Sequence, residues 1–162
     1  MKKKILTFVL GLMGTCGMWA QSAGDQAFGI NLGLAPYVGS GAYSLTNFQL
    51  GVLYQYSVVD NIRLEGDLNF GFKDKGIGMF DVSGNVQYLF NPASRFTFYP
   101  FVGIGYGNIS GWGSSSARLL FNIGLGGEYS LPANISVGLR VNYQYVKDLC
   151  RLPIAVYATY RF

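Results

Sequence analysis

Residues 62–72 read IRLEGDLNFGF, and in this stretch apolar residues alternate strictly with charged, amide or glycine residues. Successive side chains of a β-strand point to opposite faces, so strict alternation is typical of a strand with one apolar and one polar face. Arg63, Glu65 and Asp67 share the polar face. The stretch is therefore predicted to be a strand that is apolar on one side and charged on the other.

The same alternation recurs along the rest of the chain. It occurs in residues 28–38, 48–58, 80–90, 96–106, 119–131, 135–145 and 152–162, which makes eight segments with the first one. Each has about 10 to 12 residues, enough to cross a bilayer when tilted. Turn residues separate the segments, at 59–61, 91–94 and 131–134 on one side and at 73–78 and 108–116 on the other.

This pattern predicts an all-β fold, an eight-stranded antiparallel up-and-down transmembrane β-barrel. Open sheet edges cannot lie in lipid because their backbone groups would go unpaired, so the meander must close. Charged residues make up 12% of the chain, against about 25% in a typical soluble domain. The alternative is a soluble, lipocalin-like barrel with its apolar face inside. The water-facing surface of that barrel would be rich in Gly, Asn, Gln and Ser and poor in Lys, which is a poor composition for a soluble surface. The same composition suits a narrow lumen, which needs small inward residues to make room for a few large polar ones.

Aromatic residues on the apolar face fall into two groups, as in the girdles of membrane barrels. One group is Tyr54, Tyr56, Tyr88, Phe90, Phe96, Phe98, Tyr129, Tyr160 and Phe162, and the other is Phe48, Phe70, Phe72, Phe80, Tyr106, Tyr143 and Tyr145. Two girdles favour the membrane interpretation.

The N-terminus has the pattern of a secretory signal peptide. Three lysines at positions 2–4 precede an apolar run over residues 5–13 and a small-residue stretch that ends at Ala20. We expect residues 1–20 to be cleaved and residues 21–162 to form the barrel domain. Without the three lysines the formal net charge falls from +4 to +1, which gives no support to nucleic-acid binding.

The chain resembles the small outer-membrane barrel family that includes outer-membrane protein A-like transmembrane domains and opacity-type porins. The eight segments carry this resemblance, with YPFVGIGYG at residues 99–107 and the terminal VYATYRF at residues 156–162. The resemblance implies a location in the Gram-negative outer membrane, contact with its lipid, and recognition of the C-terminal strand by the barrel-assembly machinery. Tyr160 and Phe162 would then serve both assembly and the girdle. A monomer is the expected state.

The inward charges predict two ion-pair clusters across the lumen, because a charge inside a dry barrel needs a partner. Counted from the turns, Arg140 lies level with Glu65 and Asp67, and Arg63 lies near Glu128. An eight-stranded barrel is barely wide enough for its own side chains, which favours a plugged lumen. The alternative hypothesis is that the same ion pairs gate a pore.

Five further residues predicted to point inward are glycines that would leave space in the lumen, namely Gly103, Gly105, Gly107, Gly124 and Gly126. The space could admit a small ligand, or it could accommodate the rings of Tyr37, Tyr99 or Phe101. We favour the rings.

The sequence gives little reason to expect catalysis, a metal or a cofactor. It contains no histidine, which removes Ser-His hydrolysis and His metal sites. Glu65 and Asp67 have the spacing of a carboxylate pair, yet Arg63 and Arg140 would neutralise them. Cys150 is expected in the last outer loop without an internal disulfide, and Trp112 in a loop that could contact a partner. The expected function is a structural or surface-interaction barrel, with a narrow pore or transport barrel for small solutes or hydrophobic compounds as the alternative.

Overall fold

The computed structural model describes residues 22–38, 46–74, 76–111, 114–146 and 149–162, and all regular elements in these ranges are β-strands. The strands are β1 (Gln26–Val38), β2 (Thr46–Val59), β3 (Ile62–Asp74), β4 (Ile77–Tyr88), β5 (Phe96–Gly111), β6 (Ser114–Ser130), β7 (Ile135–Val146), β8 (Leu149–Arg151) and β9 (Ile154–Arg161). None of the described residues belongs to a helix long and apolar enough to cross a membrane.

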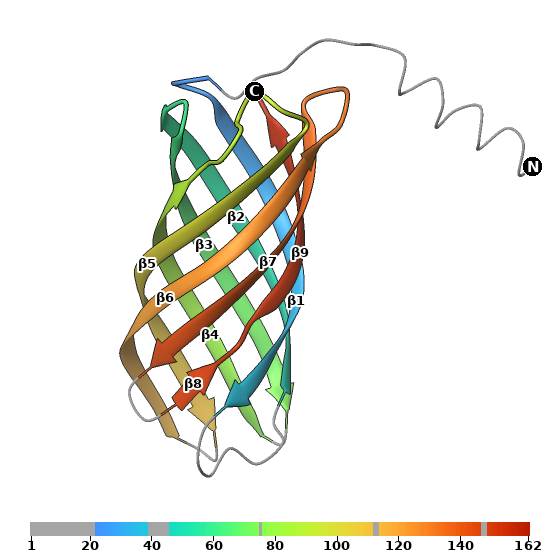
Figure 1. The fold of residues 1–162 in the computed structure, drawn as a ribbon. Coiled ribbons are helices and arrows are strands. Elements are labelled where there is room, and N and C mark those ends of the chain that lie inside the picture. The colour runs from blue at the N-terminus through green and yellow to red at the C-terminus, as the bar shows by residue number, and fades with distance from the viewer. Residues whose placement is uncertain (1–21, 39–45, 75, 112–113, 147–148) are drawn as a thin grey trace, which may run out of the picture.

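The strands close into a barrel (Figure 1). From β1 to β8 each strand pairs antiparallel with the next, and β1 pairs with β2 on one side and with β8 and β9 on the other. Both β8 and β9 also pair with β7, so they occupy one of eight positions around the barrel. The predicted eight-stranded antiparallel barrel is confirmed. We call the end that holds β1's start and the C-terminus the inner end, and the opposite end the outer end.

The last strand is interrupted at Pro153 without a change of register. Arg151 in β8 lies opposite Gln144 and Ile154 in β9 opposite Val141, which is the same alignment with β7 on both sides of the break. The Asn142 N–H donates to the Pro153 carbonyl at 3.0 Å. Because proline has no N–H, it cannot return this bond, and the strand is split there.

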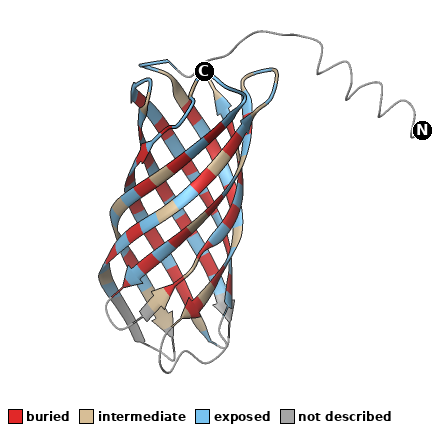
Figure 2. Cartoon of the chain, viewed as in Figure 1, coloured by how far each residue is buried: buried red, intermediate tan, exposed pale blue. Residues whose placement is uncertain are grey.

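The apolar face points outward, which excludes the inverted, lipocalin-like barrel. In β3, Ile62, Leu64 and Leu68 are exposed, whereas Arg63 and Glu65 are buried. Figure 2 shows the same alternation of buried and exposed positions along the other strands. A barrel with this exterior matches lipid, and its lumen holds the polar residues.

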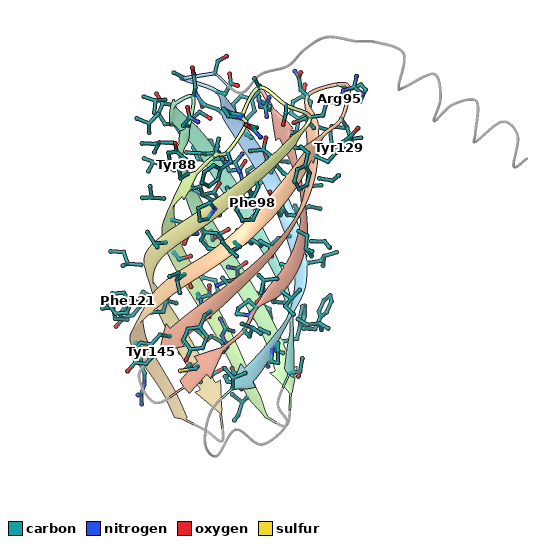
Figure 3. All side chains as sticks on the ribbon, viewed as in Figure 1. Tyr88, Arg95, Phe98, Phe121, Tyr129 and Tyr145 are labelled. Atoms are coloured by element: carbon teal, nitrogen blue, oxygen red, sulfur yellow. The ribbon has the colours of Figure 1, made fainter. Side chains whose placement is uncertain are left out.

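Exposed aromatic side chains gather towards both ends of the barrel. In Figure 3, Tyr88, Phe98 and Tyr129 lie nearer the inner end, and Phe121 and Tyr145 nearer the outer end. Neighbouring rings contact one another, as in the edge-on pair of Tyr88 and Phe90, whose ring centres are 5.0 Å apart. The two groups are placed as girdles at the membrane interfaces.

Three boundaries predicted at the outer end are wrong. The predicted turn at residues 73–78 is shorter, because β3 extends to Asp74 and β4 starts at Ile77. The predicted turn at residues 108–116 is mostly strand, because β5 and β6 stay paired as far as Gly111 and Ser114. The last strand starts at Leu149, so Cys150 and Arg151 belong to β8 rather than to an outer loop. Glycine- and serine-rich sequence is typical of turns, which explains the wrong prediction. A hairpin that extends beyond the bilayer needs no apolar face, so its strands can have this composition too.

Inward glycines make room for aromatic rings in the lumen. A Cβ atom at Gly126 would overlap the ring of Tyr99, and one at Gly124 would lie 2.6 Å from Cζ of Phe101. A Cβ atom at Gly138 would likewise overlap the ring of Tyr157. The interpretation that rings fill the glycine space is confirmed for Gly124 and Gly126. It is wrong for the other three predicted positions, where the nearest side-chain atoms come from Asn85 at Gly103, Ser83 at Gly105 and Met79 at Gly107.

We predict that Gly126→Ala lowers the free energy of unfolding by about 1–3 kcal/mol, because overpacking displaces the Tyr99 ring. The matched control is Gly84→Ala, since a Cβ at this exposed glycine of β4 meets nothing within 4 Å. The control should change stability by about 0.5 kcal/mol or less. Urea unfolding of the refolded proteins, followed by circular dichroism, measures both. Equal effects of the two variants would contradict the ring-packing account.

Candidate functional site

The lumen contains three clusters of buried ionic and polar side chains. The first, called the inner cluster, comprises Arg63, Gln87, Tyr99, Glu128 and Tyr157. Arg63 in β3 donates through Nη1 and Nη2 to both oxygens of Glu128 in β6, at 3.0 and 2.9 Å. Its Nε donates to Gln87 Oε1 at 2.6 Å. This forked geometry is the strongest that an arginine and a carboxylate can form.

Two tyrosines complete the inner cluster. Tyr99 donates to the hydroxyl of Tyr157 at 2.6 Å, and Tyr157 donates to Glu128 at 3.0 Å. The Arg63 guanidinium also lies over the Tyr99 ring, 5.2 Å from its centre. These contacts therefore replace the interactions with water that the Glu128 carboxylate and the Arg63 guanidinium lose on burial.

The second, central cluster is built around Arg140 in β7. Arg140 donates to Glu65 at 2.8 Å and to Asp67 at 2.9 Å, and both carboxylates come from β3. Two carboxylates face one arginine here, and side-chain amides supply further donors. Gln55 donates to Glu65 at 2.8 Å, and Asn85 donates to Asp67 at 2.6 Å. The structure thus brings together all five charged residues that the sequence analysis placed in the lumen, in the groupings it gave.

The third, outer cluster was not predicted from the sequence. Arg151 is 1% exposed and forms an ion pair with Asp81 of β4 at 2.9 Å. Arg151 Nε donates to Gln144 at 2.7 Å, and Asn69 donates to Asp81 at 3.1 Å. Arg151 was missed because the last strand was predicted to start at residue 152, with Cys150 in an outer loop before it. The spacing along the strand was an available signal. Side chains two residues apart share a face, and Ala155 and Tyr157 point inward, so Arg151 falls on the inward face as well.

The ion pairs of all three clusters cross the barrel rather than join neighbouring strands. They connect β3 with β6, β3 with β7, and β4 with β8, which lie three or four positions apart around the barrel. Burying such charges costs several kcal/mol per ion by desolvation unless the partners are well placed. The pairs therefore hold opposite walls of the lumen together.

A polar cavity of about 10 Å³ lies between the central and outer clusters, lined by Asp67, Asp81, Arg140 and Arg151 among others. This volume is about that of one water-sized probe. Nearer the outer end, Met79, Leu120 and Val146 form a buried apolar group against Ile109.

The described residues offer no metal-binding group of three or more His, Cys, Asp or Glu side chains. Glu65 and Asp67 are held by Arg140 rather than aimed at an open cavity. Cys150 is a partly buried free thiol in β8. Trp112 lies outside the described residues.

The C-terminal aromatic residues lie on the exposed exterior of the barrel, near its inner end. Tyr160 is an exposed residue of β9, opposite Phe28 of β1, and the chain ends with exposed Phe162. The Phe162 N–H donates to the Gln26 carbonyl at 3.0 Å. Both side chains face the surroundings of the barrel and not its lumen.

Comparison with known proteins agrees with this architecture. Residues 8–162 match the model of a family described as outer membrane protein beta-barrel domain. No curated protein matches the sequence.

Several solved structures share the fold. Neisserial surface protein A superposes with a TM-score of 0.72 at 15% identity, over 88% of this chain and 99% of that one. The N-terminal β-barrel domain of Pseudomonas aeruginosa OprF gives 0.68 at 17% identity, over 88% and 100%. The attachment invasion locus protein Ail of Yersinia pestis gives 0.59 at 16% identity, over 86% and 99%.

We predict that Arg151→Met lowers the free energy of unfolding by about 3–5 kcal/mol, because it leaves Asp81 buried without its cation. The double variant with Asp81→Leu should recover most of this loss. As a control, Arg161→Met removes a partly exposed contact of 3.8 Å with Asp25 and should cost about 1 kcal/mol or less. Urea unfolding measures all of them, and an Arg151 variant as stable as the control would show that the outer cluster is not formed.

Proposed function

Because this chain belongs to the outer membrane protein beta-barrel domain family, we propose that it serves as a structural or surface-interaction barrel with a closed lumen. It is a protein of the cell outer membrane, and lipid surrounds its apolar exterior. The closed lumen is supported by one observation, the buried arginine–carboxylate pairs that cross it at three heights. A water-filled channel would leave such side chains accessible, as in larger barrels.

The proposal includes the topology of the chain. Residues 1–20 act as a signal peptide that is removed, and residues 21–162 form the mature barrel. The inner end faces the periplasm, since an exported N-terminus starts there and the short turns 60–61 and 131–134 lie at that end. The surface-interaction role falls to the outer hairpins, of which residues 39–45 and 112–113 lie outside the described part of the chain.

We assign no catalytic role to the lumen carboxylates. An acid–base pair needs a group that can reach a substrate, whereas Glu65 and Asp67 are buried and bonded to Arg140. The lumen clusters are thus proposed to act as a plug.

A narrow pore or transport barrel is the competing function, and conductance separates the two. With a plug, the wild-type protein and Arg140→Ala both show negligible single-channel conductance in planar bilayers, because the inner and outer clusters stay in place. A gated pore predicts that Arg140→Ala raises conductance, since it opens the central cluster. Gly84→Ala, on the outer surface, is the control for the effect of substitution itself. Steady wild-type channels, or channels opened by Arg140→Ala alone, would overturn the plug.

Assembly is proposed to use the C-terminal strand, with Tyr160 and Phe162 as its aromatic signal to the assembly machinery. We predict that Phe162→Ala lowers the amount of folded protein in outer membranes severalfold, while refolding of the purified protein in detergent changes little. Phe121→Ala removes an exposed aromatic residue of β6 and should leave assembly unchanged. Unboiled gel mobility of membrane fractions measures folded protein. If both variants lost folded protein to the same extent, Phe162 would act only as a girdle residue and not as an assembly signal.

We also propose that the barrel is a monomer, because each strand edge is paired within the chain. Closure leaves no edge for a second copy to extend.

A further inference from the structure

The three lumen clusters differ in their balance of charge. The inner and outer clusters each pair one arginine with one carboxylate, at 2.9 Å in both cases. The central cluster instead sets the single arginine Arg140 against Glu65 and Asp67. All three side chains are buried, with 5% or less of their surface exposed. With both carboxylates ionised, this cluster would therefore carry one uncompensated negative charge inside the barrel.

The groups around the two carboxylates supply hydrogen bonds but no second cation. The neighbouring clusters add no net charge, because Arg63 is bound to Glu128 and Arg151 is bound to Asp81. Apart from Arg140, the described groups that lie nearest the central pair on other strands are uncharged, namely Gln55 of β2, Asn85 of β4, Tyr99 of β5 and Tyr157 of β9. The surplus charge therefore has no counter-ion among the described side chains.

The two carboxylates also lie against each other. Arg140 Nη1 donates to Glu65 Oε1 at 2.8 Å and to Asp67 Oδ2 at 3.2 Å. The same two oxygens accept from Nδ2 of Asn85, at 3.4 and 2.6 Å. Two oxygens that share both donors are neighbours, and the two carboxyl groups are within hydrogen-bond reach of each other. Like charges this close in a medium of low dielectric constant do not both ionise, and such a pair titrates as one unit.

We propose that Glu65 and Asp67 hold one proton between them at neutral pH, which makes the central cluster a proton-binding site with no net charge. The proton forms an O–H bond with one of the two facing oxygens, Glu65 Oε1 or Asp67 Oδ2, and the other oxygen accepts the hydrogen bond. The remaining single negative charge of the pair balances the positive charge of Arg140. No other bond forms or breaks, because Arg140 Nη2 still donates to Asp67 Oδ1 at 2.9 Å. The proposal depends on the burial of the pair and not on the role of the barrel.

This proton makes the central cluster the pH-sensitive one of the three. Its loss in alkaline solution leaves one uncompensated charge between β3 and β7, whereas the inner and outer clusters keep one carboxylate for each arginine. An unpaired charge in the interior is costly, so the folded barrel loses stability when the proton leaves. The link that Arg140 makes between β3 and β7 is therefore the one that responds to pH.

The test is infrared spectroscopy of the protein refolded in detergent at neutral pH, because the C=O stretch of a protonated carboxyl group is separate from the bands of carboxylates and amides. Glu65→Gln and Asp67→Asn each leave Arg140 with a single carboxylate and no proton to share. Asp60→Asn is the control, since it removes an exposed carboxylate in the turn between β2 and β3. Heat-dependent gel mobility first establishes that each variant is folded, and either lumen variant alone is sufficient for the test.

We expect one protonated carboxyl band per barrel in the wild type and in Asp60→Asn, shifted when the protein is refolded in heavy water. Both lumen variants should lack this band. In alkaline solution the band should disappear, and the urea midpoint of the wild type should fall by more than that of Glu65→Gln. The proposal is overturned if the folded wild type lacks the band, or if the band survives in either lumen variant. It is also overturned if alkaline solution lowers the two midpoints equally.

Discussion

The need to pair every backbone N–H and C=O group in hydrocarbon governs this structure. A sheet in lipid has to close, so the last strand pairs with the first, as far as Ala27 with Arg161. One proline in the first strand and one in the last show how strong the constraint is. Leu152 donates to the Pro36 carbonyl at 2.9 Å and Asn142 to the Pro153 carbonyl at 3.0 Å, so the alignment continues past both residues that lack a donor.

Closure with eight strands leaves a lumen that side chains must fill, and the chain fills it with rings, glycines and ionic clusters. Tyr99 and Tyr157 lie against Gly126 and Gly138 and connect to Glu128 through their hydroxyls. Apolar side chains would also fill the space. Hydrogen bonds between charged side chains, however, are directional, so they also fix the orientation of each side chain. The polar interior and apolar exterior are two results of the same alternation.

The sequence was sufficient for the fold and for much of the lumen, because alternation assigns each residue to a face. Arg63 and Glu128 could be matched by counting from the turns, which are short and regular at the inner end. Arg151 was missed because the charged stretch around it resembles a loop, although its spacing from Ala155 and Tyr157 would place it on the inward face of an extended last strand.

The arginine pairs that cross the lumen give the barrel mechanical stiffness. An empty tube of eight strands can flatten into an ellipse under the lateral pressure of a bilayer, since sheets bend easily between strands. Flattening would stretch or compress the bonds of Arg63, Arg140 and Arg151 to the far wall, which are short and directional. The ion pairs of these three arginines therefore act as internal struts that resist flattening of the cross-section.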